Sequence, residues 1–187
     1  MRHPTHLTSE TDISAEHNTL YQANFQSAQN VFLGFQQSET AYWQGTGQSS
    51  ITPAPWSPLA LSSDPDFSWC GGGDAQVSES IILIQVSYAN QDVTQCRMGL
   101  YQRISGSSAL SFYGAGFWTF FNNGNGCSGD CQTNGILIDN THGLYYFGIN
   151  THLVSTMVRN NGVALVQKSN NPGGWGGGVA AFLTDSQ

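Results

Sequence analysis

The sequence predicts an all-β protein whose strands stack as a parallel β-helix with a long loop insertion, and three observations favour this fold. Only 9% of the 187 residues are Asp, Glu, Lys or Arg, against roughly 25% in an average soluble domain. Long amphipathic helices need charged outer faces, so this composition disfavours a mainly helical fold. The 22 glycines and many neutral polar residues indicate a chain rich in turns. Within it, a strand–turn–strand pattern recurs.

The recurring pattern appears in the three segments 25–35, 104–114 and 138–148. Each begins with an apolar residue, passes through small or polar residues and enters an alternating strand. Alternation at period two places every second side chain on one face, and stacked units of this kind bury their inward residues coil upon coil. The corresponding residues are Phe25, Ile104 and Ile138, then Val31, Leu110 and Leu144, then Leu33, Phe112 and Tyr146. A β-sandwich with coincidental internal similarity is the alternative.

The remaining elements follow in chain order. Residues 1–13 are expected to be a non-native or disordered leader, and residues 14–187 to form the domain. Residues 45–97 interrupt the repeat, and the four prolines in their first half predict a long ordered loop, a kind of segment that often walls active sites. Trp118 and Phe120 are expected to be core or strand-stacking residues. Strands are predicted at 155–159 and 163–167, joined by an Asn-Asn-Gly turn.

Charge and cysteine content limit the possible partners. The net charge is −7, and the five Lys and Arg residues do not cluster, so neither nucleic acid nor an anionic membrane is an expected partner. No apolar run approaches the roughly 18 residues of a membrane span. The four cysteines form no zinc-type motif, so no metal or cofactor is expected and two disulfides in an oxidising compartment are favoured. The N-terminus lacks a signal-peptide core, which suggests that the natural N-terminus is missing.

Residues 14–45, SAEHNTLYQANFQSAQNVFLGFQQSETAYWQG, contain an E-H-x-x-L-Y-Q-x-x-F opening, an N-V-F strand and a Q-x-E-T-x-Y-x-Q run. Together with DPDFSWC at 64–70, YGAGFWTFFN at 113–122 and GINT at 148–151, this stretch resembles the family 55 glycoside hydrolases. The resemblance implies a secreted enzyme with two right-handed β-helices side by side, of which this chain is the C-terminal one. It also implies exo-cleavage of β-1,3-glucan with inversion.

The resemblance also implies roles for individual residues. Glu39 matches the general acid, and Glu16 matches a second active-site carboxylate near the attacking water. The aromatic and amide side chains expected to contact substrate are Tyr42, Trp43, Gln37 and Trp56. Glu16 and Glu39 are 23 residues apart, about one coil, so they are expected to stack on one face near the roughly 6.5–9.5 Å that inversion requires. His17 is expected to be a structural hydrogen-bonding residue.

The sequence departs from this family in two places. It has S-E-T-A-Y-W-Q-G where the family tends towards T-E-T-P-Y-Y-Q-P, and its tail at 170–183, NNPGGWGGGVAAFL, is unlike the usual ending. We therefore expect a glucan hydrolase fragment that is inactive without its missing N-terminal β-helix. The alternative is a non-catalytic carbohydrate-binding or structural β-helix protein.

Residues 77–95, VSESIILIQVSYANQDVTQ, fit the pattern poorly, and a retained intron that has been translated is one hypothesis for them. A genuine surface strand is the other, and sequencing the transcript distinguishes the two. Without these nineteen residues Cys70 and Cys96 would be close in sequence, and Cys127 and Cys131 are close already. The predicted disulfides are therefore Cys70–Cys96 and Cys127–Cys131.

Overall fold

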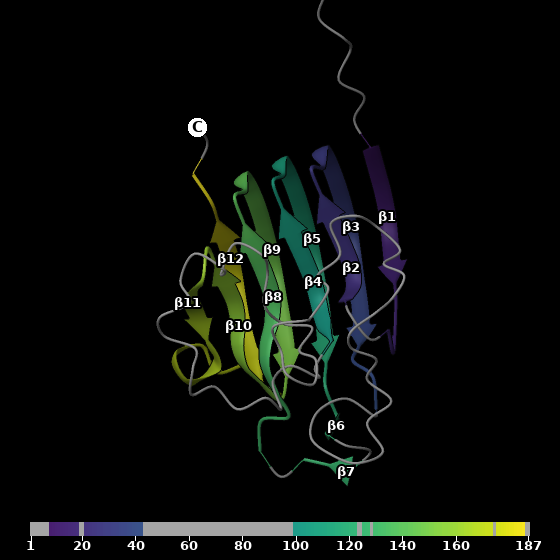
Figure 1. The fold of residues 1–187 in the computed structure, drawn as a ribbon, viewed down its shortest axis with the longest axis vertical. Helices are drawn as coiled ribbons and strands as arrows, with labels where there is room; N and C mark the ends of the chain where they lie inside the picture. Colours follow the sequence, from purple (N-terminus) through teal and green to yellow (C-terminus); the bar gives the residue numbers. More distant parts are fainter. Residues whose placement is uncertain are drawn as a thin grey trace, which may run out of the picture.

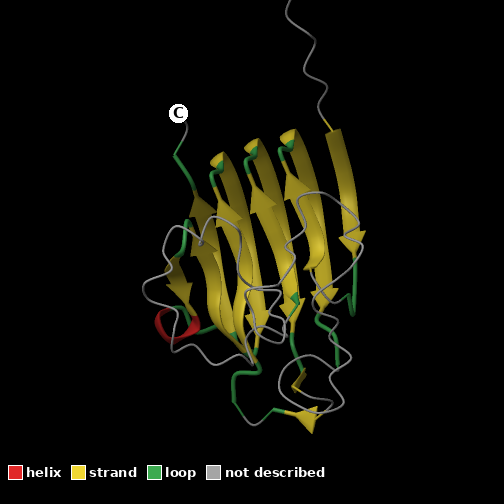
Figure 2. Cartoon of the chain, in the orientation of Figure 1, coloured by secondary structure: helices red, strands yellow, loops and turns green. Residues whose placement is uncertain are grey.

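The computed structural model describes residues 8–18, 21–42, 99–122, 125–127, 129–173 and 175–185. They form strands and turns with one short 3-10 helix, η4 (Lys168–Asn170), so the predicted all-β class is confirmed (Figure 2). Two five-stranded sheets lie face to face, in the orders β1-β3-β5-β9-β12 and β11-β10-β8-β4-β2 (Figure 1). No helix among the described residues is long and apolar enough to cross a membrane.

The first sheet consists of β1 (Thr8–Ser14), β3 (Gln29–Glu39), β5 (Ser108–Trp118), β9 (His142–His152) and β12 (Gly177–Leu183). The second consists of β2 (Tyr21–Gln26), β4 (Leu100–Ser105), β8 (Gln132–Asp139), β10 (Val154–Asn160) and β11 (Val163–Gln167). A short ribbon of β6 (Phe121–Asn122) and β7 (Asn125–Gly126) follows β5.

Both sheets are mixed, with parallel pairing through most of each and antiparallel pairing at one end. Strands β1, β3, β5 and β9 are parallel, whereas β12 runs antiparallel to β9. Strands β2, β4, β8 and β10 are likewise parallel, and β11 is antiparallel to β10. Parallel neighbours cannot be joined by a tight hairpin. Here the chain crosses from the second sheet to the first at the β2–β3, β4–β5 and β8–β9 turns.

The register of the strands reproduces the repeat predicted from the sequence. The apolar residues that open each repeat are paired, because Phe25 lies opposite Ile104 and Ile104 opposite Ile138. The two following sets, Val31–Leu110–Leu144 and Leu33–Phe112–Tyr146, are also register partners. The correspondence is confirmed, as is the Asn-Asn-Gly turn between antiparallel β10 and β11.

The three crossing turns share a backbone conformation. Ser27, Gly106 and Asn140 occupy equivalent positions with φ of 49°, 57° and 46°. A left-handed residue lets the chain bend sharply, and only glycine adopts it without cost. Successive turns are then bonded to one another, since the Ser27 amide donates to the Ser105 carbonyl at 2.8 Å and the Gly106 amide to the Asp139 carbonyl at 3.0 Å. The polar stretch of each repeat is thus explained by a stack of turns.

The core fills the space between the sheets. Leu33, Phe112 and Tyr146 are fully buried there and form a row across three strands. The Tyr146 hydroxyl donates to Gln102 Oε1 at 3.0 Å, and Gln102 in turn donates to Gln36 Oε1, so a chain of hydrogen bonds links these buried side chains. Burial raises the pKa of the Tyr146 phenol, which keeps it protonated and able to donate.

Strand β1 begins six residues before the domain boundary expected at residue 14. It pairs in parallel with β3, and Ile13 packs against the core. The sequence of β1, TSETDIS, has little apolar alternation. It is an edge strand held mainly by backbone hydrogen bonds to β3, so composition could not reveal it. Residues 1–7 and the loop 45–97, with its segment 77–95, lie outside the described residues.

Candidate functional site

The two candidate carboxylates meet where neighbouring parallel strands end. Glu39 is the last residue of β3, and Glu16 follows the end of β1 by two residues. The strand ladder continues beyond both ends, because the Ala15 amide donates to the Gln37 carbonyl at 3.4 Å and the His17 amide to the Glu39 carbonyl at 2.9 Å. The spacing of 23 residues therefore brings Glu16 beside Glu39, as expected for one coil.

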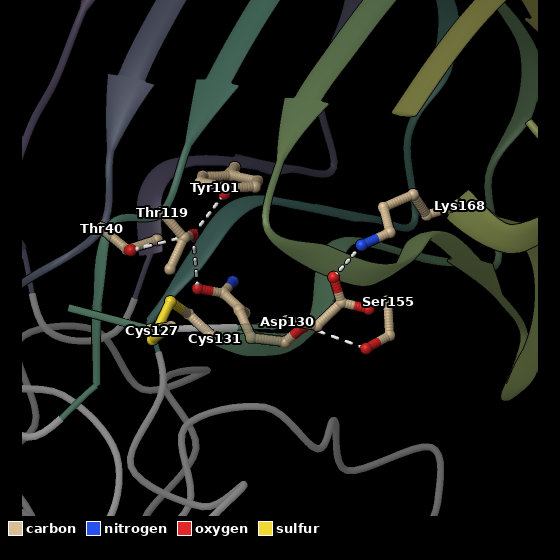
Figure 3. The surroundings of a disulfide bond; sticks show 9 residues. Thr40, Tyr101, Thr119, Cys127, Asp130, Cys131, Ser155 and Lys168 are labelled. Carbon is tan, nitrogen blue, oxygen red and sulfur yellow. Dashed lines mark hydrogen bonds and ion pairs between the residues drawn. A yellow bond between two sulfur atoms is a disulfide. The ribbon is translucent and has the colours of Figure 1, made fainter. Parts of the chain in front are cut away.

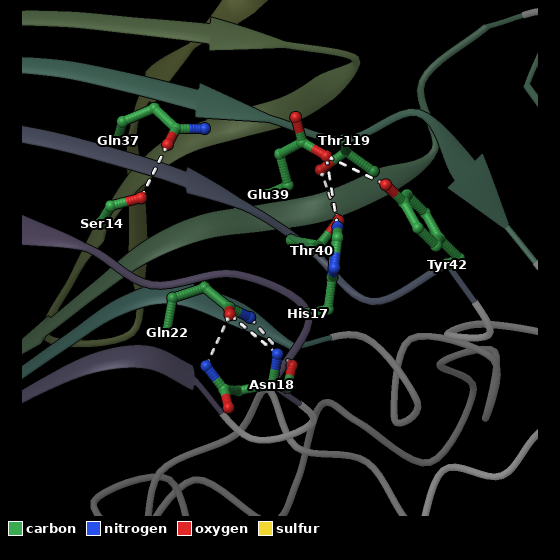
Figure 4. A network of polar contacts seen from close by, with 9 residues as sticks. All are labelled: Ser14, His17, Asn18, Gln22, Gln37, Glu39, Thr40, Tyr42 and Thr119. Atoms are coloured by element: carbon green, nitrogen blue, oxygen red, sulfur yellow. Dashed lines mark hydrogen bonds and ion pairs between the residues drawn. The ribbon is translucent and has the colours of Figure 1, made fainter.

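Two side chains contact the Glu39 carboxyl (Figure 4). His17 Nε2 lies 3.2 Å from Glu39 Oε2, and the Tyr42 hydroxyl donates to the same oxygen at 3.4 Å. The side chains of Glu39 and His17 are 23% and 29% exposed. Oxygen Oε1 of Glu39 has no partner among the described residues. Within the described residues, one oxygen is thus held by protein and the other makes no contact.

Aromatic contacts fix the group around Glu39. The rings of His17 and Tyr42 lie 4.1 Å apart, and Tyr42 makes an edge-on contact with Phe121 at 4.9 Å. Partial desolvation, and secondarily the negative charge of Glu39, raises the pKa of Tyr42. Tyr42 therefore remains a hydrogen-bond donor to Glu39 throughout the neutral range. The expectation that His17 is a hydrogen-bonding residue agrees with this geometry.

The separation of the carboxyl groups differs from the expected one. One carboxylate oxygen each of Glu16 and Glu39 and one ring nitrogen of His17 all lie within 4.8 Å of one another. Inverting glycosidases hold their two carboxyl groups roughly 6.5–9.5 Å apart so that a water fits between them on the far side of the sugar. Glu16 and Glu39 follow adjacent strand ends on one face of the sheet, as expected, but these atoms lie closer together than that range. The catalytic roles expected for the two residues stay predictions.

A mixed set of carboxylate and imidazole donors also suits a divalent cation. Within the described ranges, Glu16, His17 and Glu39 are a group close enough to share one. Exposed acidic groups commonly lie together without an ion, so the expected absence of a metal stays a prediction.

A buried hydrogen-bonded chain anchors Thr40, the residue that follows β3 (Figure 3). Thr40 is buried and donates to Thr119 Oγ1 at 3.0 Å, and Thr119 donates to Gln132 Oε1 at 3.2 Å. The hydroxyl of Tyr101 also contacts Thr119, and burial raises the pKa of that phenol. Because each buried group is bonded, the end of β3 has a defined position relative to β5 and β8.

The predicted disulfide between Cys127 and Cys131 is confirmed, with the two Cα atoms 5.6 Å apart. Cys131 is buried, and its amide donates to the Leu153 carbonyl at 2.9 Å. The bridge therefore ties the segment after β7 to the start of β8 (Figure 3). The expected partner pair Cys70 and Cys96 lies outside the described residues.

The residues expected to bind substrate are only partly brought together. Tyr42 contacts Glu39, whereas Gln37 lies two residues earlier on the same outward face of β3, where it accepts a hydrogen bond from Ser14 at 3.0 Å. Trp43 and Trp56 lie outside the described residues.

Sequence reasoning missed the aromatic residues next to this site. Trp118 on β5 is the register partner of Glu39, and His152 on β9 is the register partner of Trp118. Trp118 and Phe120 both contact Trp175 rather than the core, at ring distances of 5.0 and 5.7 Å. Neither residue belongs to the buried core that was one of the two expectations, and both instead pack at a tilt against Trp175. The signal available in the sequence was the single Trp within the glycine-rich tail.

No protein-family model matches the chain. Three curated fungal proteins are similar to it. A "Glucan endo-1,3-beta-glucosidase BGN13.1" of Trichoderma harzianum is 34% identical over 180 residues, which is 92% of this chain and 21% of that protein. A "Probable glucan endo-1,3-beta-glucosidase" of Arthroderma benhamiae is 27% identical over 90% of this chain and 17% of its own length. A "Glucan 1,3-beta-glucosidase" of Cochliobolus carbonum is 31% identical over 77% of this chain and 16% of its own length.

The chain is related to fungal glucan hydrolases. It spans about a fifth of the length of these relatives. The matches cover 92%, 90% and 77% of this chain. Any function proposed for this chain therefore concerns only one part of a protein as long as these relatives.

Proposed function

We propose that this chain is the acid-bearing part of a glycoside hydrolase of the family 55 type, acting on β-1,3-glucan, and that Glu39 is the general acid. The observation that carries the proposal is the Glu39 carboxyl at the end of β3, held at Oε2 by His17 and Tyr42 and open at Oε1. A glycosidic oxygen placed at Oε1 would receive the proton as the bond to the sugar breaks. Such proton transfer contributes roughly 10²–10⁴-fold to the rate.

The proposal includes the overall architecture. The stacked parallel strands, the repeated crossings between two sheets and the confirmed repeat register support a right-handed parallel β-helix. In this proposal the antiparallel strands β11 and β12 close one end of the stack. The domain runs from β1 to the C-terminal strand, and residues 77–95 remain a proposed intron-derived segment within the loop. The disulfide supports a secreted, extracellular protein.

Exo-cleavage with inversion requires a base that faces Glu39 across the sugar. Since Glu16 lies beside Glu39 on the same side, we propose that Glu16 tunes the charge around the acid and that the base belongs to a preceding β-helix of a longer protein. The 187-residue chain by itself should then hydrolyse glucan negligibly, because positioning of water and substrate is missing.

The test uses a chimera in which this chain replaces the aligned segment of the Trichoderma harzianum relative. Release of reducing sugar from laminarin is measured for the chimera and for its Glu39→Gln form, with Asp185→Asn as a control that removes an exposed carboxylate elsewhere. We expect Glu39→Gln to lose roughly 10²–10⁴-fold in kcat and the control to lose little. Equal rates for Glu39→Gln and the parent chimera would remove Glu39 from the mechanism.

The products test the finer parts of the proposal. Exo-cleavage with inversion releases glucose alone, initially as the α-anomer, which NMR of the early products detects. A ladder of oligosaccharides would instead place this chain with its two relatives named as endo-enzymes. A non-catalytic carbohydrate-binding or structural role is the alternative, and it predicts no hydrolysis in any chimera.

A further inference from the structure

A second feature lies on the same outward face of the first sheet. It is a pocket with a volume of about 270 Å³. The pocket is lined by glycines and small residues along its floor and by aromatic rings at its sides. The residues used below are Trp118, Trp175, Asn150, Gly116, Gly176 and Gly177.

The strand register places this pocket beside Glu39. Glu39 on β3 pairs with Trp118 on β5, and Trp118 pairs with His152 on β9. Two residues earlier on β3, Gln37 lies on the same outward face. It pairs with Gly116 on β5, and Gly116 pairs with Asn150 on β9. Neighbouring strands are about 4.8 Å apart, so the row from Glu39 to His152 spans roughly 10 Å. The carboxylate cluster and the pocket are two ends of one row.

The glycine-rich tail builds the far wall of the pocket. A Cβ atom on Gly176 would lie 2.1 Å from the carbonyl oxygen of Thr151, and one on Gly177 would lie 2.5 Å from Met157 Sδ. Only glycine allows the chain to lie so close to β9 at these positions. The loop that carries Trp175 is thereby pressed against the sheet, while Trp175 itself remains 58% exposed.

Trp175 is held in place although it is exposed. His152 stacks on it with ring centroids 4.1 Å apart and planes 18° apart, and its Nδ1 lies 2.8 Å from the Trp175 carbonyl oxygen. Trp118 lies 5.0 Å from Trp175 at 49°, so the two indoles form adjoining walls. Gly116 makes room for Trp118, because a Cβ there would lie 2.6 Å from its ring. An ordered aromatic surface loses little entropy when a ligand binds.

The lining selects the chemistry of the ligand. Among the described residues that line it there is no charged side chain, and the carboxylates of Glu39 and Glu16 nearby disfavour an anion. Indole faces attract C–H groups, and the Asn150 amide offers hydrogen bonds to hydroxyls. A β-glucopyranose ring has an apolar face of axial C–H groups and a rim of hydroxyls. The volume is slightly below the usual range of about 300–1,000 Å³ for small-molecule sites, which suits one such ring.

We propose that this pocket is a glycosyl-binding subsite that holds one neutral pyranose unit of a β-glucan chain, with Trp118 and Trp175 as its walls. The identity of the sugar rests on the function proposed above, whereas the binding itself requires no catalysis. In this proposal the unusual tail at 170–183 positions Trp175 beside the row that begins at Glu39.

The test measures binding of laminarihexaose to the 187-residue chain by isothermal titration calorimetry. We expect Trp175→Ala to weaken binding roughly 5- to 10-fold. Tyr113→Ala is the matched control, because Tyr113 is an exposed aromatic residue of β5 outside the pocket. Unchanged affinity in Trp175→Ala, or an equal loss in Tyr113→Ala, would overturn the subsite.

Folding of each variant is checked by circular dichroism. If Trp175→Ala does not fold, Gly116→Ala replaces it, since the added Cβ displaces the Trp118 ring from inside the pocket and should also weaken binding several-fold. Asp185→Asn removes an exposed carboxylate outside both the carboxylate cluster and the pocket, so it should bind laminarihexaose like the parent chain. Binding without Glu39-dependent hydrolysis supports the subsite alone, and hydrolysis with no effect of Trp175→Ala on affinity refutes it alone. A Trp175→Ala variant that changes only the sedimentation of the chain would show that a second copy covers the pocket, and would also refute it.

Discussion

The two ends of the outward row on the first sheet are built by different means. The carboxylate end is made by adjacent parallel strands that finish together, so Glu16, His17 and Glu39 converge through backbone pairing. The aromatic end is made by a loop that returns to the sheet, and Trp175 is held by ring stacking and close glycine packing. The first end is charged and fixed by the strand ladder. The second is uncharged and depends on a few close contacts, so each can be disrupted without the other.

The largest effect should come from the core that supports both ends. Phe112 is fully buried and contacts the rings of Phe25 and Tyr146 at 4.8 and 5.3 Å. Replacing it with alanine leaves a cavity that costs about 3–5 kcal/mol in the free energy of unfolding. Urea denaturation measures this change, with Phe32→Ala on the exposed face as the control. A loss below about 1 kcal/mol would show that the two sheets do not share this core.

Disrupting only the aromatic end is the purpose of Gly176→Ala. Its Cβ would meet the Thr151 carbonyl, which is backbone and cannot turn aside. We expect a cost of about 1–3 kcal/mol and loss of the Trp175 wall. The affinity for glucan should then fall. In the chimera, Glu39→Gln should still reduce the rate of hydrolysis by the same factor when Gly176→Ala is present. Full glucan affinity in Gly176→Ala would contradict the role given to the tail.

Loosening only the carboxylate end is the purpose of the double variant Cys127→Ser with Cys131→Ser. The disulfide closes a short loop with a sequence separation of 4, so its removal should cost about 2 kcal/mol through the entropy of the unfolded chain. Thermal unfolding with and without reductant measures this cost. The parent chain should lose more stability on reduction than the double variant, which keeps only Cys70 and Cys96.

A smaller effect should appear at alkaline pH. Burial raises the pKa of Tyr101 above its ordinary value of 10.0, so the folded state holds this proton after the unfolded chain has released it. Stability from this group is fully present below pH 10 and decreases above it, by at most about 1.4 kcal/mol per pH unit. Tyr101→Phe should therefore show a shallower loss of stability between pH 10 and 11 than the parent chain. Identical slopes in denaturation curves would contradict this linkage.

The smallest effect concerns an ion pair on the surface. Lys168 of η4 contacts Asp130, and both side chains are about one-third exposed, at 30% and 28%. Exposed ion pairs contribute about 0–1 kcal/mol and are screened by salt. Asp130→Asn should change the unfolding free energy by less than about 1 kcal/mol. Because the pair supports neither end of the row, hydrolysis in the chimera and binding by the chain should both be unchanged.

The sequence by itself determined the strand–turn–strand repeat. Alternation at period two is a local property, so the repeat correctly paired Phe112 with Leu33 and Tyr146. The spacing of 23 residues placed Glu16 beside Glu39, and short separation joined Cys127 to Cys131. These results follow from patterns that lie within one or two repeats of chain.

Only the tertiary structure decided what surrounds Glu39. Strand β1 has a polar sequence and is fixed by its pairing with β3, so no hydrophobic pattern predicts it. The close approach of Glu16 to Glu39, on one side of any sugar, depends on how two strand ends continue beyond the ladder. Trp175 reaches the row because β12 returns antiparallel along β9 and glycines allow close packing. Contacts of this kind join distant parts of the chain, and their energy depends on packing that no local pattern contains.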